Sequence, residues 1–170
     1  ERLSALTANI AFAGFTAPKI LWMKENEPEN FARIKKIMLP KDFIAYRLSG
    51  SFCTDVSDAS GTLLFDVKNR RWSKEMLDIC GIDESLLPRV YESYEPVGTL
   101  KEEHAKALDL SNNVKIAAGA GDNAAAAIGT GTVSDGDCNI SLGTSGTIFV
   151  SSEKFCVDNN NALHAFAHAN

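Results

Sequence analysis

Apolar residues recur at the three- and four-residue spacing of helices over much of the first hundred positions of this chain. Proline near the first turn, or Ser, Thr or Asp at the cap, marks where several runs begin, and glycine follows two of them. The pattern predicts a helix from Pro18 with Thr16 as cap, and a second from Pro28 with Phe31, Ile34 and Met38 on one face. A third covers Lys41–Leu48, and a fourth runs from Thr54 or Asp55 to Ser60. The last two cover Trp72–Cys80, with Ser73 as cap and Gly81 after its end, and Leu100–Leu108. Leu39 is assigned to a short strand.

The pattern changes near residue 114, where two short strand-like runs each end in a glycine-rich turn. Residues 114–118 are apolar and partly β-branched, and Gly119-Ala120-Gly121 leads from them into an alanine-rich helix that begins at Asp122. Residues 139–142 form the second run, which ends in Gly143-Thr144-Ser145-Gly146. Strands mixed with helices in this way predict the α/β class.

Local pattern leaves two interpretations of each turn. Aspartate is among the best N-cap residues, so Asp122 either caps the helix or presents a carboxylate at the end of a strand. Gly143-Thr144-Ser145-Gly146 fits either an ordinary hairpin turn or a phosphate loop with bare N–H groups and hydroxyls. No Walker string and no Gly-x-Gly-x-x-Gly with an acidic partner occurs, so the standard nucleotide fingerprints are absent.

The two glycine-rich strings closely resemble the junction of the two domains in FGGY-type carbohydrate kinases, and within that family the xylulokinases. The strings are Gly-Ala-Gly-Asp-Asn-Ala-Ala-Ala-Ala from residue 119 and Ser-Leu-Gly-Thr-Ser-Gly from residue 141. Further segments resemble the family in order and spacing: Gly14–Lys19, Leu21-Trp22, Glu27-Pro28, Leu39–Phe43, Thr54–Thr62 and Ala162–Ala169. The resemblance therefore extends over nearly the whole chain.

The resemblance implies an actin-like, ribonuclease-H-like sugar kinase fold with two domains. Residues 1–131 would be the C-terminal part of the first, sugar-binding domain, and residues 132–170 would begin the second, nucleotide-binding domain. Members of the family are much longer, so we expect a middle fragment that is inert alone. Because a hairpin without its partner strands has open edges, we expect residues 138–157 to be disordered, mispaired or used in association between chains, as in a homodimer.

The activity that the resemblance implies is ATP-dependent phosphorylation of D-xylulose to D-xylulose 5-phosphate. Asp122 would be the general base and contact the sugar, Asn123 would bind sugar hydroxyls, and Gly143, Thr144 and Ser145 would cradle the phosphates of ATP. Mg²⁺ is the second implied cofactor, with no direct metal ligand assigned in this chain. Two alternatives stay open: a kinase for ribulose, gluconate or glycerol, and a non-catalytic actin-like module that binds nucleotide.

Composition excludes some partners and leaves others. The net charge is -5, and the basic residues are dispersed, so a nucleic-acid binder is not expected. No apolar run approaches the ~20 residues of a membrane span, and we expect a cytoplasmic protein. The four cysteines, Cys53, Cys80, Cys138 and Cys156, are far apart and are interpreted as buried free thiols.

Three other features have a structural and a functional interpretation. The oxygen-rich run Thr54–Thr62 lacks the spacing of an EF-hand, so capping and turn bonds explain it, while the resemblance places it near the substrate cleft. His164 and His168 would share a helix face as metal ligands or alternate along a strand, and metal binding is disfavoured. Trp22 and Trp72 are assigned to the core or a cleft edge rather than to a sugar platform.

Overall fold

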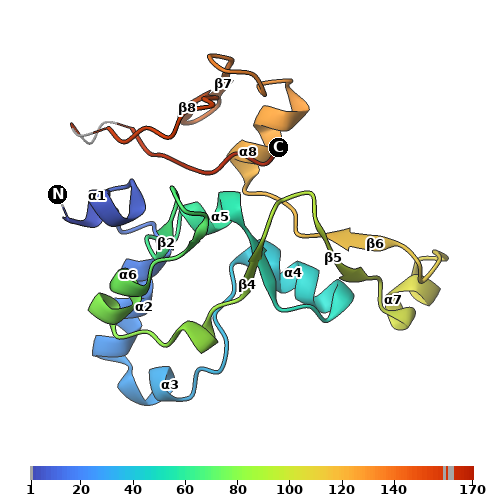
Figure 1. Ribbon diagram of the computed structural model, residues 1–170. Coiled ribbons are helices and arrows are strands. Elements are labelled where there is room, and N and C mark those ends of the chain that lie inside the picture. The colour runs from blue at the N-terminus through green and yellow to red at the C-terminus, as the bar shows by residue number, and fades with distance from the viewer. Residues whose placement is uncertain (1, 159, 161–162) are drawn as a thin grey trace.

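The computed structural model describes residues 2–158, 160 and 163–170, and Ala162 of the C-terminal motif lies outside them (Figure 1). The helices of the described part are α1 Arg2–Thr7, α2 Thr16–Asn26, α3 Pro28–Ala32, α4 Pro40–Ser49, α5 Val56–Ser60, α6 Lys74–Cys80, α7 Glu102–Ala107 and α8 Asp122–Gly129, with the 3-10 turn η1 Glu84–Leu86. The strands are β1 Cys53–Asp55, β2 Phe65–Asp66, β3 Arg71–Trp72, β4 Arg89–Tyr91, β5 Pro96–Thr99, β6 Lys115–Ala117, β7 Cys138–Leu142 and β8 Gly146–Val150. This mixture of helices and strands confirms the α/β class.

The strands form separate pairs. β1 and β4 are parallel, with Thr54 opposite Val90, while β2–β3, β5–β6 and β7–β8 are antiparallel. The parallel pair lies at the centre of the body, with α4 and α5 beside it (Figure 1). Helix α8 and the β7–β8 hairpin lie above this body, and the chain enters α8 from below. The two parts of the molecule meet at the entry to α8 and also where the C-terminal segment packs on α5 and Asn9.

Two apolar clusters hold the body together. The larger one joins α2 to α6 through the segment at Leu63 and Leu64, which are 1% and 0% exposed. The smaller one gathers around Phe65, and Trp72 packs against both clusters. The Trp72 indole meets Phe65 edge-on at 5.6 Å between ring centroids and donates to the carbonyl of Pro88 at 2.8 Å. Trp72 is therefore a packing residue, as expected, whereas Trp22 is 57% exposed and does not belong to the core.

Several predicted helix ends are confirmed. Asp55 caps α5 by accepting the N–H groups of Ser57 and Asp58, and Ser73 caps α6 by accepting that of Met76. Gly81 ends α6 in the left-handed conformation, with φ 59°. Each of these signals is a short-range hydrogen bond or a backbone preference, so the local sequence is enough to specify it.

Other predicted elements are wrong. Thr16 is the first residue of α2 rather than its cap, because Phe15 occupies the cap position with extended backbone. The helix from Pro28 ends at Ala32, well before Met38, because the chain beyond it is drawn toward η1, where the N–H of Ile37 donates to the carbonyl of Leu86 at 2.8 Å. Leu39 is the extended residue before α4 and belongs to no strand. Leu100 and Leu108 flank a shorter α7.

The β7–β8 hairpin is paired in register, with Leu142 opposite Gly146, so the expectation of a disordered or mispaired segment is wrong for these strands. One face of the hairpin exposes apolar side chains, among them Ile140 at 59% and Ile148 at 71%. Cys53 and Cys80 are buried, as expected, but Cys138 and Cys156 are exposed. The expectation of four buried thiols fails at Cys138 because no layer of the described chain packs on that face of the hairpin, and at Cys156 because it lies in an exposed segment after β8.

Candidate functional site

Asp122 lies where the turn after β6 enters α8. Gly119 has φ 80°, and a Cβ added to it would lie 3.2 Å from Cδ of Lys41, so both backbone conformation and space favour glycine there. Gly121 occupies the cap position, and Asp122 is the first helical residue, so Asp122 is not the cap. Its Oδ1 accepts the N–H of Asn123 at 2.8 Å, and both side chains are exposed. The turn therefore presents a carboxylate and an amide side by side to solvent.

A buried ion cluster lies beneath this turn. Nζ of Lys41 lies 2.9 Å from Oδ1 of Asp42 and 3.0 Å from Oδ1 of Asp55, and it donates to the carbonyl of Ala118 at 3.1 Å. The side chains of Asp42 and Asp55 are 1% and 0% exposed. The ammonium group thus joins α4 and β1 to the start of the turn.

The protonation equilibria of this cluster reflect its burial. Burial lowers the pKa of the Lys41 ammonium, but the carboxylates of Asp42 and Asp55 more than offset that effect and leave the pKa raised. Burial also raises the pKa of Asp42, and Lys41 offsets this only in part. Removing one partner from such a cluster would leave an uncompensated charge in a buried site.

A second connection runs from the same carboxylate to the turn. Oδ2 of Asp55 accepts the hydroxyl protons of Ser57 at 2.5 Å and of Ser93 at 2.6 Å. The Ser57 oxygen in turn accepts the N–H of Gly121 at 3.0 Å, and the N–H of Gly119 donates to the carbonyl of Ser93 at 3.0 Å. Hydrogen bonds from the N–H groups of Gly119 and Gly121 therefore hold the turn, in addition to the bond from Lys41 to its first residue.

Asp58 lies against the same turn. A Cβ on Gly121 would lie 3.6 Å from Cα and from Oδ1 of Asp58. Burial raises the pKa of Asp58 to about 6; Lys41 opposes the rise, and the charges of Asp42, Asp55 and Asp122 add to it. Asp58 and Asp122 are thus electrostatically coupled carboxyl groups on the two sides of the turn.

The predicted phosphate loop is at the tip of the β7–β8 hairpin. Gly143, Thr144 and Ser145 connect the strands and are all exposed. The N–H of Gly143 donates to the carbonyl of Ser145 at 3.0 Å, so it is not the bare group that the sequence suggested. Among the hydrogen bonds and ion pairs of the described residues, none joins this loop to Asp122 or Asn123. The structure brings Asp122 and Asn123 together and leaves the loop separate.

Sequence reasoning missed part of this site. The run Thr54–Thr62 contains Asp55, Ser57 and Asp58, but the sequence pattern predicts no role in the site for Lys41, Asp42 or Ser93. The signals for the first two are an adjacent Lys-Asp pair between apolar residues at the start of a predicted helix, and the position of both residues in Leu39–Phe43, one of the segments that resemble the family. The signal for Ser93 is absent from its local sequence, because its partner Asp55 lies 38 positions away.

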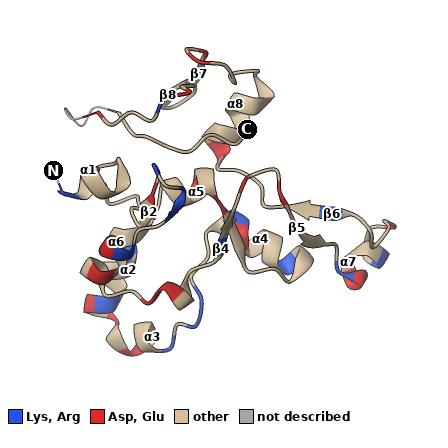
Figure 2. Ribbon diagram, in the orientation of Figure 1, with Lys and Arg blue, Asp and Glu red and all other residues tan. Residues whose placement is uncertain are grey.

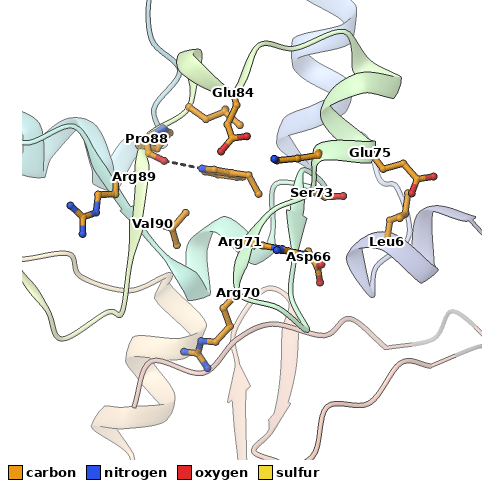
Figure 3. A pocket seen from close by; sticks show the side chains of 13 residues that line it. Leu6, Asp66, Arg70, Arg71, Ser73, Glu75, Glu84, Pro88, Arg89 and Val90 are labelled. Carbon is orange, nitrogen blue, oxygen red and sulfur yellow. Dashed lines mark hydrogen bonds between the residues drawn. The ribbon is translucent and has the colours of Figure 1, made fainter.

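One hollow of the body lies elsewhere. It measures about 890 Å³ and lies between the β2–β3 pair and the segment from Glu84 to Val90 (Figure 3). Arg70 and Arg89 line it together with Glu75 and Glu84, so its lining carries both charges. None of the residues predicted for the site lines this hollow, and we do not assign the site to it.

The two C-terminal histidines belong to neither a helix nor a strand. A ring nitrogen of His164 lies 3.1 Å from Oδ1 of Asn9, and one of His168 lies 2.9 Å from the carbonyl of Thr132. Both rings also make edge-on contacts with phenylalanines, His164 with Phe15 and His168 with Phe149. These contacts give each histidine a packing role.

The described residues carry neither a metal-binding group nor a membrane-spanning helix. In residues 2–158, 160 and 163–170, no group of three or more His, Cys, Asp or Glu side chains is arranged to hold a metal ion. No helix in the part of the chain that the structure describes is long and apolar enough to cross a membrane. Lys and Arg are interspersed with Asp and Glu along the helices (Figure 2).

Comparison with known proteins gives consistent matches. The model of the N-terminal domain of the FGGY family of carbohydrate kinases matches residues 1–129. The chain is 47% identical over 168 residues to the xylulose kinase of Lactococcus lactis subsp. lactis (strain IL1403), covering 99% of this chain and 33% of that protein. The chain therefore spans about a third of the length of this relative.

Solved structures agree with the sequence matches. The xyloylose kinase from Brucella ovis aligns with a TM-score of 0.95 and 45% identity, over 99% of this chain and 35% of that chain. The gluconate kinase from Lactobacillus acidophilus aligns with a TM-score of 0.93 and 28% identity, over 99% of this chain and 34% of that chain. Nearly the whole chain, 99% of it, thus has a counterpart in each of these structures.

The buried ion cluster generates a stability prediction for the full-length protein that contains this chain. Lys41→Met should lower the free energy of unfolding by about 3 to 5 kcal/mol, because two buried carboxylates lose their cation. Lys106→Met is the matched control: Lys106 is 74% exposed and pairs with Glu102, so its loss should change stability by about 0.5 kcal/mol or less. Denaturant unfolding measures both variants, and equal effects would contradict the burial argument.

Asp58 generates a prediction about pH. Folded, its carboxyl keeps a proton up to about pH 6, whereas in the unfolded chain it titrates near pH 4. The folded state therefore binds more protons in this window, and the contribution of Asp58 to stability falls as pH rises from about 4 through 6. Asp58→Asn should raise Tm relative to the parent progressively between these values, and a constant Tm difference from pH 4 to 7 would refute the assignment.

The control for this measurement is Asp83→Asn. The N–H of Ser85 donates to Asp83 and lowers the pKa of that exposed carboxyl. Its contribution to stability is present above pH 4 and is lost only as pH falls through its lowered pKa, which is the opposite sense. The two variants should therefore shift the Tm profile in different pH ranges.

Proposed function

This chain belongs to the FGGY family of carbohydrate kinases, and from that membership we propose that the full-length protein containing it transfers the γ-phosphoryl group of ATP to D-xylulose. The product would be D-xylulose 5-phosphate. The chain has the actin-like, ribonuclease-H-like fold of the family's solved structures. The observation that carries the proposal is the turn between β6 and α8, which hydrogen bonds to buried side chains hold in place and which presents Asp122 to solvent. This turn occurs in a chain 47% identical to a xylulose kinase.

In this proposal the two parts of the structure bind different substrates. Residues 1–131 complete the sugar-binding domain, and residues 132–170 begin the nucleotide-binding domain. The N-terminal family model ends at residue 129, which supports a boundary at this point. Gly131, with φ 75°, supplies a backbone position that tolerates rotation between the two parts.

Asp122 acts as the general base in this proposal. The oxygen of the sugar hydroxyl attacks the γ-phosphorus, the bond from that phosphorus to the ADP oxygen breaks, and the hydroxyl proton passes to the Asp122 carboxylate. Asn123 lies one residue further on, with an amide that both donates to and accepts from sugar hydroxyls. The exposure of both side chains leaves them accessible to a substrate.

The hairpin tip would hold the phosphates of ATP. Thr144 and Ser145 offer exposed hydroxyls, and the absence of a side chain on Gly143 lets phosphate oxygens approach the backbone. Mg²⁺ bound with ATP would neutralise phosphate charge and keep several of its waters, with the Asp122 carboxylate nearby and not as a direct ligand. Because the tip and Asp122 do not touch, catalysis requires the two parts to close around the substrates.

The first test is a coupled ADP-release assay on the full-length protein, with D-xylulose, D-ribulose, gluconate, glycerol and no sugar in parallel. D-xylulose should give a selective rise in ADP. A selective rise with another of these substrates would reassign the substrate, and ATP binding with no response to any of them would favour the nucleotide-binding module.

Substitution of the base is the second test. Asp122→Asn keeps the shape but cannot accept the proton in the same way, so kcat should fall by about 10²- to 10⁴-fold with an unchanged Tm. Asp109→Asn is the control, because Asp109 is an exposed acid in a left-handed turn that asparagine tolerates. Retention of more than a few per cent of the parental kcat in Asp122→Asn would rule out the base.

The hairpin tip is tested by Gly143→Val. A Cβ at this position would meet only the carbonyl oxygen of Ser145, at 3.8 Å, so the folded chain accommodates it. The added bulk should therefore weaken ATP binding more than D-xylulose binding, as measured by calorimetry. Gly14→Val, where a Cβ would meet nothing within 4 Å, should change neither affinity. Equal losses for ATP and sugar in Gly143→Val would contradict the phosphate assignment.

A further inference from the structure

We propose that Ser57, oriented by Asp55, is a positioning residue that sets the geometry of Asp122 in the kinase reaction. The inference deepens the proposed function and rests on it. It starts from one contact: the Ser57 hydroxyl oxygen accepts the N–H of Gly121, the residue directly before Asp122.

The direction of this hydrogen-bond chain is fixed by proton count. A serine hydroxyl has a single proton, and that of Ser57 is given to Oδ2 of Asp55 at 2.5 Å. A carboxylate can only accept, so the lone pairs of the Ser57 oxygen point away from Asp55 and are free for the N–H of Gly121. The backbone N–H of Ser57 also donates to the same Oδ2, at 2.9 Å, and this bond restricts the rotation of the Asp55 carboxylate further.

Asp55 is itself fixed from its other side. Its Oδ1 pairs with Lys41, and Oδ2 also accepts the hydroxyl of Ser93. The same lysine donates to the carbonyl of Ala118 at the start of the turn. The turn is therefore held at its first residue by Lys41 and at its last by Ser57, with Asp55 common to both.

Burial excludes direct catalysis by these groups. Asp55 is 0% exposed and Ser57 is 3% exposed, so neither reaches a substrate at the surface where Asp122 lies. Their influence on the reaction must pass through the backbone of the turn. A displacement of the Asp122 carboxylate by a fraction of an ångström is enough to reduce a rate that depends on alignment.

Ser57→Ala tests the inference in the full-length enzyme. The variant leaves the N–H of Gly121 without its acceptor, and kcat should fall about 10- to 100-fold while KM for D-xylulose and for ATP stays within about twofold. Ser57→Thr restores a hydroxyl and should recover most of the lost kcat. Amide hydrogen exchange at Gly121 should be faster in Ser57→Ala than in the parent, a readout that does not depend on activity.

Ser60→Ala is the matched control. Ser60 lies on the same helix, is 0% exposed, donates to the carbonyl of Val56 at 2.7 Å and accepts the N–H of Ala167 at 3.0 Å. Like that of Ser57, its hydroxyl donates one hydrogen bond and accepts one backbone N–H, but the donor lies in the C-terminal segment instead of the turn. Ser60→Ala should therefore lower Tm about as much as Ser57→Ala and leave kcat within about twofold of the parent.

The outcomes distinguish failure of the positioning role of Ser57 from failure of the proposed kinase function. A parental kcat in Ser57→Ala, with activity lost in Asp122→Asn, overturns the positioning role alone. Equal losses of kcat in Ser57→Ala and Ser60→Ala also overturn it, because they show a general effect of destabilisation. Activity retained in Asp122→Asn overturns the proposed base and the positioning role together.

Discussion

The buried pairing of Lys41 with Asp42 and Asp55 is the interaction on which the candidate site depends. A carboxylate that is fully withdrawn from water is costly unless a cation and hydrogen-bond donors surround it, and Asp55 has both. The residues that supply this cation and these donors come from α4, α5 and the segment beside β4. They therefore pack together around β1 and against the turn before α8. Because Lys41 and Ser57 bind both the Asp55 carboxylate and the turn, the groups that stabilise this carboxylate also fix the backbone that presents Asp122.

The two halves of the proposed machinery are built by different means. The turn at Asp122 is fixed from below by buried side chains, whereas the tip at Thr144 is formed by a two-stranded hairpin with an exposed apolar face. A turn held by buried contacts and a separate hairpin tip would suit the proposed reaction, in which sugar and ATP bind to different parts and are then brought into line. The link between the halves, at Gly131, is the place where such a movement would be absorbed.

The sequence predicted those features that depend on neighbouring residues. The caps at Asp55 and Ser73 follow from short-range hydrogen bonds, and the turn and hairpin follow from strings that resemble a known family. The ion cluster escaped prediction because Lys41 and Ser93 lie far from Asp55 along the chain, and no periodicity relates them. The helix after Pro28 was overextended for a similar reason, since a tertiary hydrogen bond at Ile37 overrides a helical pattern.

The convergence of several chain segments around one buried carboxylate also constrains how this sequence can change. Groups that share a hydrogen-bond network do not contribute independently, so the effect of replacing Ser57 or Ser93 depends on whether Lys41 and Asp55 are still in place. A substitution that is harmful alone can be neutral once its partner has changed. The outcome of a substitution at any one of these positions therefore depends on which residues occupy the others.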